Sequence, residues 1–301
     1  MRAVSHRLRG RKARVHGQRF PRQGCRLETD GHHPDQGAVS VRWAQAGFQS
    51  LYPGTRQGPG EDRHVLGSIK SSPAWVWGAR GKLPVAGDYV SLGADSSLLK
   101  AFSGWVEKGF STLANKPISS SSWRFWAKGT KREDLVCGLL RDSADSLGRP
   151  YPFLVLGTGT LPGWEERWEL LPQAFHDHWN RMEYLSTRRV QNLGDLEGDL
   201  NMLGLPVLPQ SSRPSAPVSL RLPEGERAYL DERRALFIPL KSSEHEDSVE
   251  TLVQWHAFFK ARLDHPPTTV FIGGKVDVPY LVVFQRSLLS GDFNRLWTVE
   301  Q

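Results

Sequence analysis

The sequence predicts an α/β fold, a layered α/β/α domain with a mixed sheet, followed by a small C-terminal α+β extension. Short runs of aromatic and β-branched residues, typical of strands, alternate with longer segments whose apolar residues recur every three or four positions, as in amphipathic helices. Hydrophobic residues make up 39% of the chain and 11 residues are Trp, enough for a sizeable core. Strands and helices in this order favour a sheet flanked by helices.

The predicted strands are short runs in which aromatic, aliphatic or β-branched side chains predominate. They lie at Trp75–Trp77, Trp123–Ala127, Leu135–Leu140, Tyr151–Leu156, Ala235–Leu240, Thr268–Ile272 and Val278–Phe284. Glycine-containing stretches that begin at Gly78 and Gly157 are expected to end the first and the fourth of these strands. The last two runs flank Gly273 and Gly274, which suits a β-hairpin.

The predicted helices are segments with apolar residues on one face. They lie at Asp95–Asn115, Gly163–Leu185, Ser248–Leu263 and, as a closing turn or short helix, Ser290–Trp297. We expect Asp95 to cap the first helix and Pro117 to end it. Pro172 lies within the second segment, so a kink or a second helix that begins at Pro172 is expected there.

Composition divides the chain into a tail, a domain, a linker and a second unit. Residues 71–190 hold the predicted α/β domain, residues 191–226 are rich in Gly, Asp, Pro and Ser and predict a linker, and residues 227–301 predict a C-terminal α+β subdomain. Residues 1–70 have few aliphatic side chains and predict a disordered basic tail. Two interpretations of this tail stay open: an arm that binds anionic lipid or nucleic acid, and translated sequence upstream of the true start.

The net charge of +7 belongs to the tail. Residues 1–70 contain 13 Lys and Arg and 5 Asp and Glu, whereas the remaining 231 residues contain 26 and 27. The part expected to fold is therefore close to neutral. Because phosphate affinity needs concentrated positive charge, the sequence disfavours nucleic-acid binding by the folded part and leaves it open only for the tail.

Signatures of several functional classes are absent from the sequence. It has no G-x-S-x-G, H-E-x-x-H, Walker or G-x-G-x-x-G motif, so we expect no enzyme, although dispersed side chains can still assemble a catalytic triad in space. No apolar run is long enough for a membrane-spanning helix. Cys25 and Cys137 predict no disulfide and a reducing, cytoplasmic compartment. Neither a metal site nor a cofactor is expected.

Two polar loops contain the candidate site residues. The first loop holds Gly81, Lys82, Pro84, Gly87 and Asp88, and the second holds Ser143, Asp145, Gly148 and Arg149. In one interpretation the acids cap backbone N–H groups and Arg149 forms a structural salt bridge. In another, both loops lie together at one edge of the sheet and a partner binds them. Phosphate binding by Lys82 and Arg149 is a third interpretation.

These loops resemble the TagF/ImpM family of type VI secretion-associated proteins. Gly81-Lys82-Leu83-Pro84 and Gly87-Asp88-Tyr89 resemble the family's opening signature, and the segment from Ser143 to Phe153 resembles its Ser-x-Asp-x-x-Gly-Arg-x-Phe/Tyr-Pro stretch. Trp123-Arg124-Phe125 resembles the family's Trp-Arg-Phe strand, which adds Trp123 to the candidate residues. The motifs occur in the family's order between about Trp75 and Leu185 and support the α/β class. The long basic N-terminus departs from the family pattern.

The resemblance implies a cytoplasmic, non-enzymatic repressor of type VI secretion assembly that binds a forkhead-associated scaffold protein. Some relatives are fused to a phosphatase domain, whose metal-binding Asp motifs this sequence lacks. The alternative is a phosphate- or small-ligand-binding protein, or an enzyme, that uses Lys82, Asp88, Asp145 and Arg149. Convergence of these four side chains in a concave pocket would favour a ligand, and exposed loops beside an apolar patch would favour a protein partner.

Overall fold

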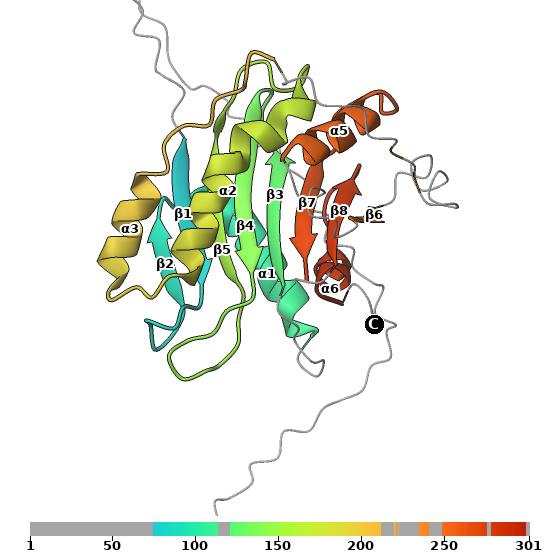
Figure 1. Cartoon of the computed structure of the whole chain (residues 1–301). Helices are drawn as coiled ribbons and strands as arrows, with labels where there is room; N and C mark the ends of the chain where they lie inside the picture. The colour runs from blue at the N-terminus through green and yellow to red at the C-terminus, as the bar shows by residue number, and fades with distance from the viewer. Residues whose placement is uncertain are drawn as a thin grey trace, which may run out of the picture. The chain divides into compact units, whose positions relative to one another are not determined.

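A single sheet runs through the part of the chain that the structure, a computed structural model, describes (Figure 1). The described residues are 75–113, 121–211, 220, 222, 235–240, 249–275 and 278–298. Its eight strands have the order β2-β1-β5-β4-β3-β7-β8-β6. They are β1 Val76–Gly81, β2 Val90–Gly93, β3 Ser122–Lys128, β4 Asp134–Arg141, β5 Phe153–Thr160, β6 Leu236–Pro239, β7 Thr269–Gly274 and β8 Pro279–Phe284. The tail predicted at residues 1–70 lies outside the described residues.

All pairings between these eight strands are antiparallel, so the prediction of a mixed sheet is wrong. The connections explain the difference. A parallel pair needs a crossover of a dozen or more residues, whereas an antiparallel pair can be joined by a short turn. Strands β3 and β4 are neighbours in the sheet joined only by residues 129–133, and β7 and β8 are neighbours joined by residues 275–278.

The C-terminal strands continue the same sheet and do not form the separate α+β subdomain that the sequence predicted. Strand β7 pairs with β3 from Ala127↔Thr269 to Ser122↔Gly274. Without β7, the long apolar strand β3 would be an unpaired edge, which natural sheets avoid. The predicted linker differs too, because it contains helix α3, Leu193–Asn201, capped by the side chain of Asn192.

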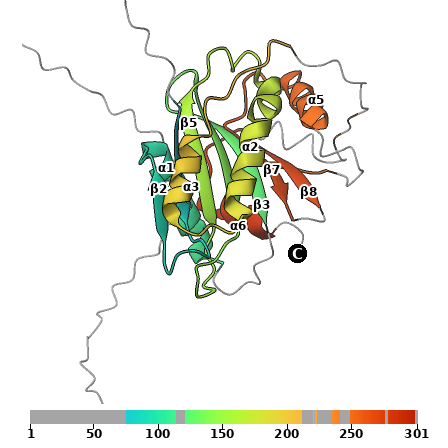
Figure 2. The same cartoon turned by 60° about the vertical axis from the view of Figure 1, so that its left-hand side comes forward.

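Helices cover both faces of the sheet, which confirms the α/β/α layers (Figure 2). Helices α2, α3 and α5 (Leu171–Thr187, Leu193–Asn201 and Val249–Lys260) pack on one face. Helices α1 and α6 (Ser97–Ser111 and Ser290–Thr298) pack on the other. A short 3₁₀ helix, η1 Trp168–Leu170, precedes α2, and Pro172 lies in the first turn of α2, as predicted. None of the described helices is long and apolar enough to cross a membrane.

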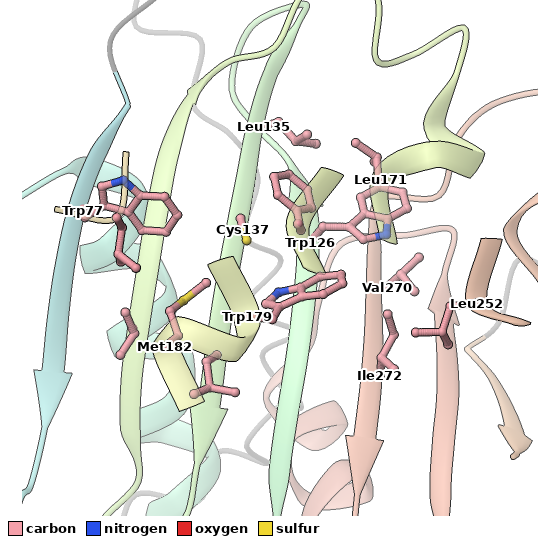
Figure 3. Packing of buried hydrophobic residues seen from close by; sticks show 14 of the residues in the cluster. Trp77, Trp126, Leu135, Cys137, Leu171, Trp179, Met182, Leu252, Val270 and Ile272 are labelled. Carbon is pink, nitrogen blue, oxygen red and sulfur yellow. The ribbon is translucent and has the colours of Figure 1, made fainter. Parts of the chain in front are cut away.

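The side chains between these layers form two apolar cores. On the α2 and α5 side, Trp126 of β3 lies beside Cys137 of β4, and Trp179 of α2 belongs to the same core (Figure 3). On the α1 and α6 side, Phe125 lies against Phe271, with ring centroids 5.2 Å apart. Because β3 contributes to both cores, the sheet is the element around which the described part of the chain packs.

Two glycines and one cap differ from the sequence predictions. Gly78 and Gly157 lie inside strands and do not end them. A Cβ at Gly157 would lie 2.3 Å from the Trp77 ring, so the glycine leaves space for the indole. Helix α1 is capped by the Ser96 side chain, which accepts a hydrogen bond from the Leu99 backbone N–H, whereas Asp95 pairs with basic side chains instead.

Candidate functional site

The sheet brings the two predicted loops together. One loop, residues 82–89, connects β1 to β2, and the other, residues 142–152, connects β4 to β5. Strand β1 pairs with β5 so that Gly81 lies opposite Phe153, which places both loops at the same end of adjacent strands. The backbone N–H of Ser146 donates to the carbonyl of Ala86 at 2.8 Å and joins them directly. We call residues 82–89 and 142–152 the paired loops.

Asp145 is the centre of the paired loops. Its Oδ1 accepts hydrogen bonds from the backbone N–H groups of Leu147 (3.0 Å) and Arg149 (2.9 Å). Its Oδ2 accepts from Nε of Arg149 at 2.7 Å and lies 3.1 Å from Nζ of Lys82. Each carboxylate oxygen therefore has two partners, and the side chain is fully buried.

These contacts keep Asp145 ionised. Burial alone would raise the pKa of its carboxyl group, but the hydrogen bonds from Arg149, Lys82 and Leu147 hold that pKa well below its usual range. A carboxylate with such a low pKa and four donors is a poor general base. The arrangement is that of a structural centre which orients both loops.

Arg149 connects this centre to the surface. Its Nη2 donates to the carbonyl of Gly87 at 2.7 Å and lies 3.9 Å from Oδ1 of Asp88. The Asp88 side chain is 83% exposed, so this longer ion pair is weak, and Asp88 caps only the backbone N–H of Tyr89. The predicted salt bridge and capping role therefore belong chiefly to Arg149 and Asp145.

Glycines permit the tight backbone of these loops at two positions. Gly81 has a φ of 133°, and a Cβ there would lie 2.1 Å from the carbonyl oxygen of Pro152. Gly148 has a φ of 75° in the turn that Asp145 closes, with open space around it. Gly87, by contrast, has neither a positive φ nor a close neighbour. Pro84 is exposed in the first loop.

The outer surface of the paired loops presents apolar groups beside charges. Leu147 is 73% exposed and Tyr89 is 44% exposed, next to the charged ends of Asp88 and Arg149. The Tyr89 ring packs edge-on against the Tyr151 ring, with their centroids 5.3 Å apart. We call Asp88, Tyr89, Leu147 and Arg149 the loop surface. Exposed apolar side chains on loops held this firmly are typical of a contact surface.

A comparison with protein-family models assigns this part of the chain. Residues 78–201 match the family described as TagF N-terminal domain, Type VI secretion system-associated. The chain carries a TagF N-terminal domain. This domain contains both paired loops and helices α1, α2 and α3, and the match confirms the family resemblance of the sequence motifs.

One solved structure is similar to most of the chain. It is the crystal structure of PA0076 from Pseudomonas aeruginosa PAO1, with 18% sequence identity and a TM-score of 0.45 over 75% of this chain and 95% of that chain. No protein in the curated set matches the chain.

The remaining candidate residues of the TagF domain have other surroundings. Trp123 is fully buried in β3, edge-on to Phe271 at 6.3 Å, and belongs to the core on the α1 and α6 side. Ser143 contributes its carbonyl, which accepts from the backbone N–H of Tyr151 at 2.9 Å and closes the second loop. The structure thus unites the other predicted residues and separates Trp123 from them.

Sequence reasoning missed the exposed apolar residues of the TagF domain. Tyr89 and Leu147 lie within the quoted motifs, yet nothing in their spacing distinguishes an exposed position from a buried one. A second exposed group, Met202, Leu205 and Val207, follows α3. Within the described ranges, no group of three or more His, Cys, Asp and Glu side chains is arranged to hold a metal ion.

Proposed function

We propose that this chain is a cytoplasmic, non-enzymatic repressor of type VI secretion assembly that binds a forkhead-associated scaffold protein through the loop surface. The match of residues 78–201 to the type VI secretion-associated TagF N-terminal domain supports this proposal. The observation that carries the choice of surface is Leu147, 73% exposed at the tip of a loop whose base is held by the buried Asp145 carboxylate.

The ordered backbone of the paired loops favours binding of a partner through the loop surface. An interface loses less conformational entropy when its contact groups are already ordered in the free protein. Asp145 accepts hydrogen bonds from the backbone N–H groups of Leu147 and Arg149, and the Arg149 side chain donates to Asp145 and to the Gly87 carbonyl of the other loop. Leu147 and Tyr89 would supply apolar contact area, and Asp88 and Arg149 would supply a charged rim that selects the partner.

The same geometry disfavours the alternative of a phosphate site or an active site at these loops. Lys82 and Arg149 both contact the Asp145 carboxylate, which occupies the position that a bound phosphate would need. Its low pKa removes Asp145 as a proton acceptor near neutral pH. We therefore propose that the loop surface binds a protein partner and that the Asp145 carboxylate and its partners form no phosphate site or active site.

Repression would follow from mass action. A protein that binds one state of the scaffold withdraws that state from assembly, by an amount set by the affinity and the free concentration. No catalytic step is needed, so the effect would reverse when the regulator dissociates. The proposal requires that the amount of scaffold bound, and not a catalytic turnover, sets the extent of secretion assembly.

Co-purification and calorimetric titration of the full chain with the forkhead-associated protein of the same secretion cluster test the proposal. Leu147→Asp should weaken binding by at least about tenfold, because it places a charge in the apolar centre of the interface. Val207→Asp is the matched control, since Val207 is also 73% exposed but follows the matched residues 78–201.

The two variants separate the family function from the choice of surface. Loss of binding in Leu147→Asp alone supports the proposal. Loss in Val207→Asp alone would move the interface to the segment after α3, and wild-type chain that fails to bind the scaffold at all would contradict the choice of partner.

A further inference from the structure

A groove lies beside the paired loops, between them and helix α1. It has a volume of about 510 Å³ and is lined by Arg80 of β1, by Tyr89 and Tyr151, and by the face of α1 that runs from Lys100 to Glu107. Residues on that face recur at three- and four-residue spacing, so they form one wall. The volume falls in the range of small-molecule sites.

Two buried polar atoms of this groove have no hydrogen-bond partner in the described structure. They are Nε of Arg80 and Oγ of Ser103. Buried polar groups are almost always satisfied, because leaving one unpaired costs free energy. Nε–H can only donate and the serine hydroxyl can donate, so each of these two groove residues has a free donor for an acceptor.

Arg80 is only partly engaged by the protein. Its Nη2 donates to Asp95, which also pairs with Lys100 at 2.8 Å, while Nε stays free. Asp95 is 54% exposed, and exposed ion pairs contribute little free energy, so its contact with Arg80 can be exchanged. An oxyanion accepts from two nitrogens of one guanidinium at once, which Asp95 does not do here.

The rest of the groove suits a flat organic group. The Tyr89 and Tyr151 rings form one end, with centroids 5.3 Å apart, and Glu107 lies on the adjoining stretch of α1. The carboxylate of Glu107 disfavours a second anion there, so the negative group belongs at the Arg80 end and the uncharged body at the tyrosine end. Gly104 has no side chain to fill the groove, and nothing lies within 4 Å of where its Cβ would be.

We infer that this groove binds an organic oxyanion, a phosphate or a carboxylate, whose charged group is held by Arg80 and Ser103 and whose body lies against Tyr89 and Tyr151. The site is distinct from Asp145 and its partners. It shares Tyr89 with the loop surface, but its small-molecule ligand can be tested on the free chain without the forkhead-associated partner.

Calorimetric titration of the full chain with phenyl phosphate tests the inference. Phenyl phosphate should bind once per chain, more tightly than inorganic phosphate, because its ring adds contact with the tyrosines. Phenylacetate distinguishes a carboxylate source from a phosphate source. The neutral 2-phenylethanol should bind at least roughly tenfold more weakly than phenyl phosphate, because it lacks the charge that Arg80 recognises.

Two glycine variants locate the binding. Gly104→Leu fills the groove and should abolish phenyl phosphate binding while it retains or raises the melting temperature, because glycine is a poor residue inside a helix. Gly198→Leu is the matched control. Gly198 also lies in a helix with nothing within 4 Å, but in α3, away from the residues that line the groove.

Ser103→Ala separates binding from folding. The hydroxyl has no partner in the free protein, so its loss should retain or raise stability and weaken phenyl phosphate binding several-fold. Phenyl phosphate that binds no more tightly than 2-phenylethanol would overturn the inference, as would binding that survives Gly104→Leu.

Discussion

Lys82 and Asp145 form an ion pair of 3.1 Å that ties the β1–β2 loop to the β4–β5 loop. The Lys82 side chain is 15% exposed and the Asp145 side chain is fully buried, so neither charge has much water to stabilise it if the other is removed. Breaking a buried pair by removing one partner is far more disruptive than losing an exposed one. The pair therefore holds the loop surface in place.

Asp145→Asn should lower the melting temperature by several degrees and reduce hydrogen-exchange protection in both paired loops, because Lys82 and Arg149 lose their shared counter-ion. Asp88→Asn is the control, since that carboxylate is 83% exposed and should change neither quantity. Equal melting temperatures for Asp145→Asn and the wild type would show that the pair does not hold the loops.

Gly81 at the end of β1 and the two glycines of the paired loops, Gly87 and Gly148, should differ in their response to alanine. Gly81→Ala should cost about 3 kcal/mol, because Cβ would meet the Pro152 carbonyl at a positive φ. Gly148→Ala should cost about 1 kcal/mol, the strain of a left-handed residue without a clash. Gly87→Ala should stay within about 0.5 kcal/mol. Urea unfolding measures all three, and any other order contradicts the account.

His256 should make the chain less stable as the pH falls toward 5. Burial lowers the pKa of this histidine to about 4, while Trp126 donates to its Nε2 at 3.1 Å and its Nδ1 lies 2.7 Å from the Leu252 carbonyl. Between about pH 6.5 and 4 the unfolded chain binds a proton that the folded chain does not, so stability rises with pH across this window. The total effect of this group is about 3 kcal/mol.

Urea unfolding at pH 7.5 and pH 5 checks this. His256→Gln should be less stable than wild type at pH 7.5, yet lose less stability on acidification. Exposed His265→Gln should keep the wild-type difference between the two pH values. A His256→Gln variant with the full wild-type pH dependence would assign the effect to other groups.

Phe271→Ala should destabilise the whole sheet and not a C-terminal part of it. The ring contacts Phe125 of β3 at 5.2 Å and Phe284 of β8 at 5.9 Å, so its removal leaves a cavity between strands from both halves of the sequence. The expected cost is about 3–5 kcal/mol. Near- and far-ultraviolet circular dichroism should report one coincident transition. Two separate transitions would favour the two-unit organisation.

Much of the local structure could be predicted from short stretches of sequence. The apolar spacing from Leu98 to Phe110 predicted α1, and Pro172 correctly predicted the first turn of α2. One of the interpretations of the sequence placed the two motif loops together, and in the structure Lys82 and Arg149 both contact Asp145. Periodicity and turn chemistry depend on residues close in the chain, so they can be read without the fold.

Other features needed information that distant residues supply. Gly157 looks like a strand end until Trp77 is placed over it. The sequence does not distinguish Leu147 from other loop leucines. The structure shows that its side chain is exposed and that Asp145, two residues earlier, is buried. The Arg80–Ser103 groove combines a strand with a helix and has no sequence motif. Exposure and empty space are properties of the packed chain, and a single sequence does not encode them at any fixed spacing.

The sequence by itself determined the family of residues 78–201, most element positions and the charged groups of the paired loops. Only the tertiary structure decided that β7 pairs with β3, that every pairing among the described strands is antiparallel, and that Trp123 is a buried core residue. The physical reason is that strand pairing is selected by which apolar faces can be buried together. That choice depends on the whole sheet, whereas helix periodicity and turn formation depend on neighbours along the chain.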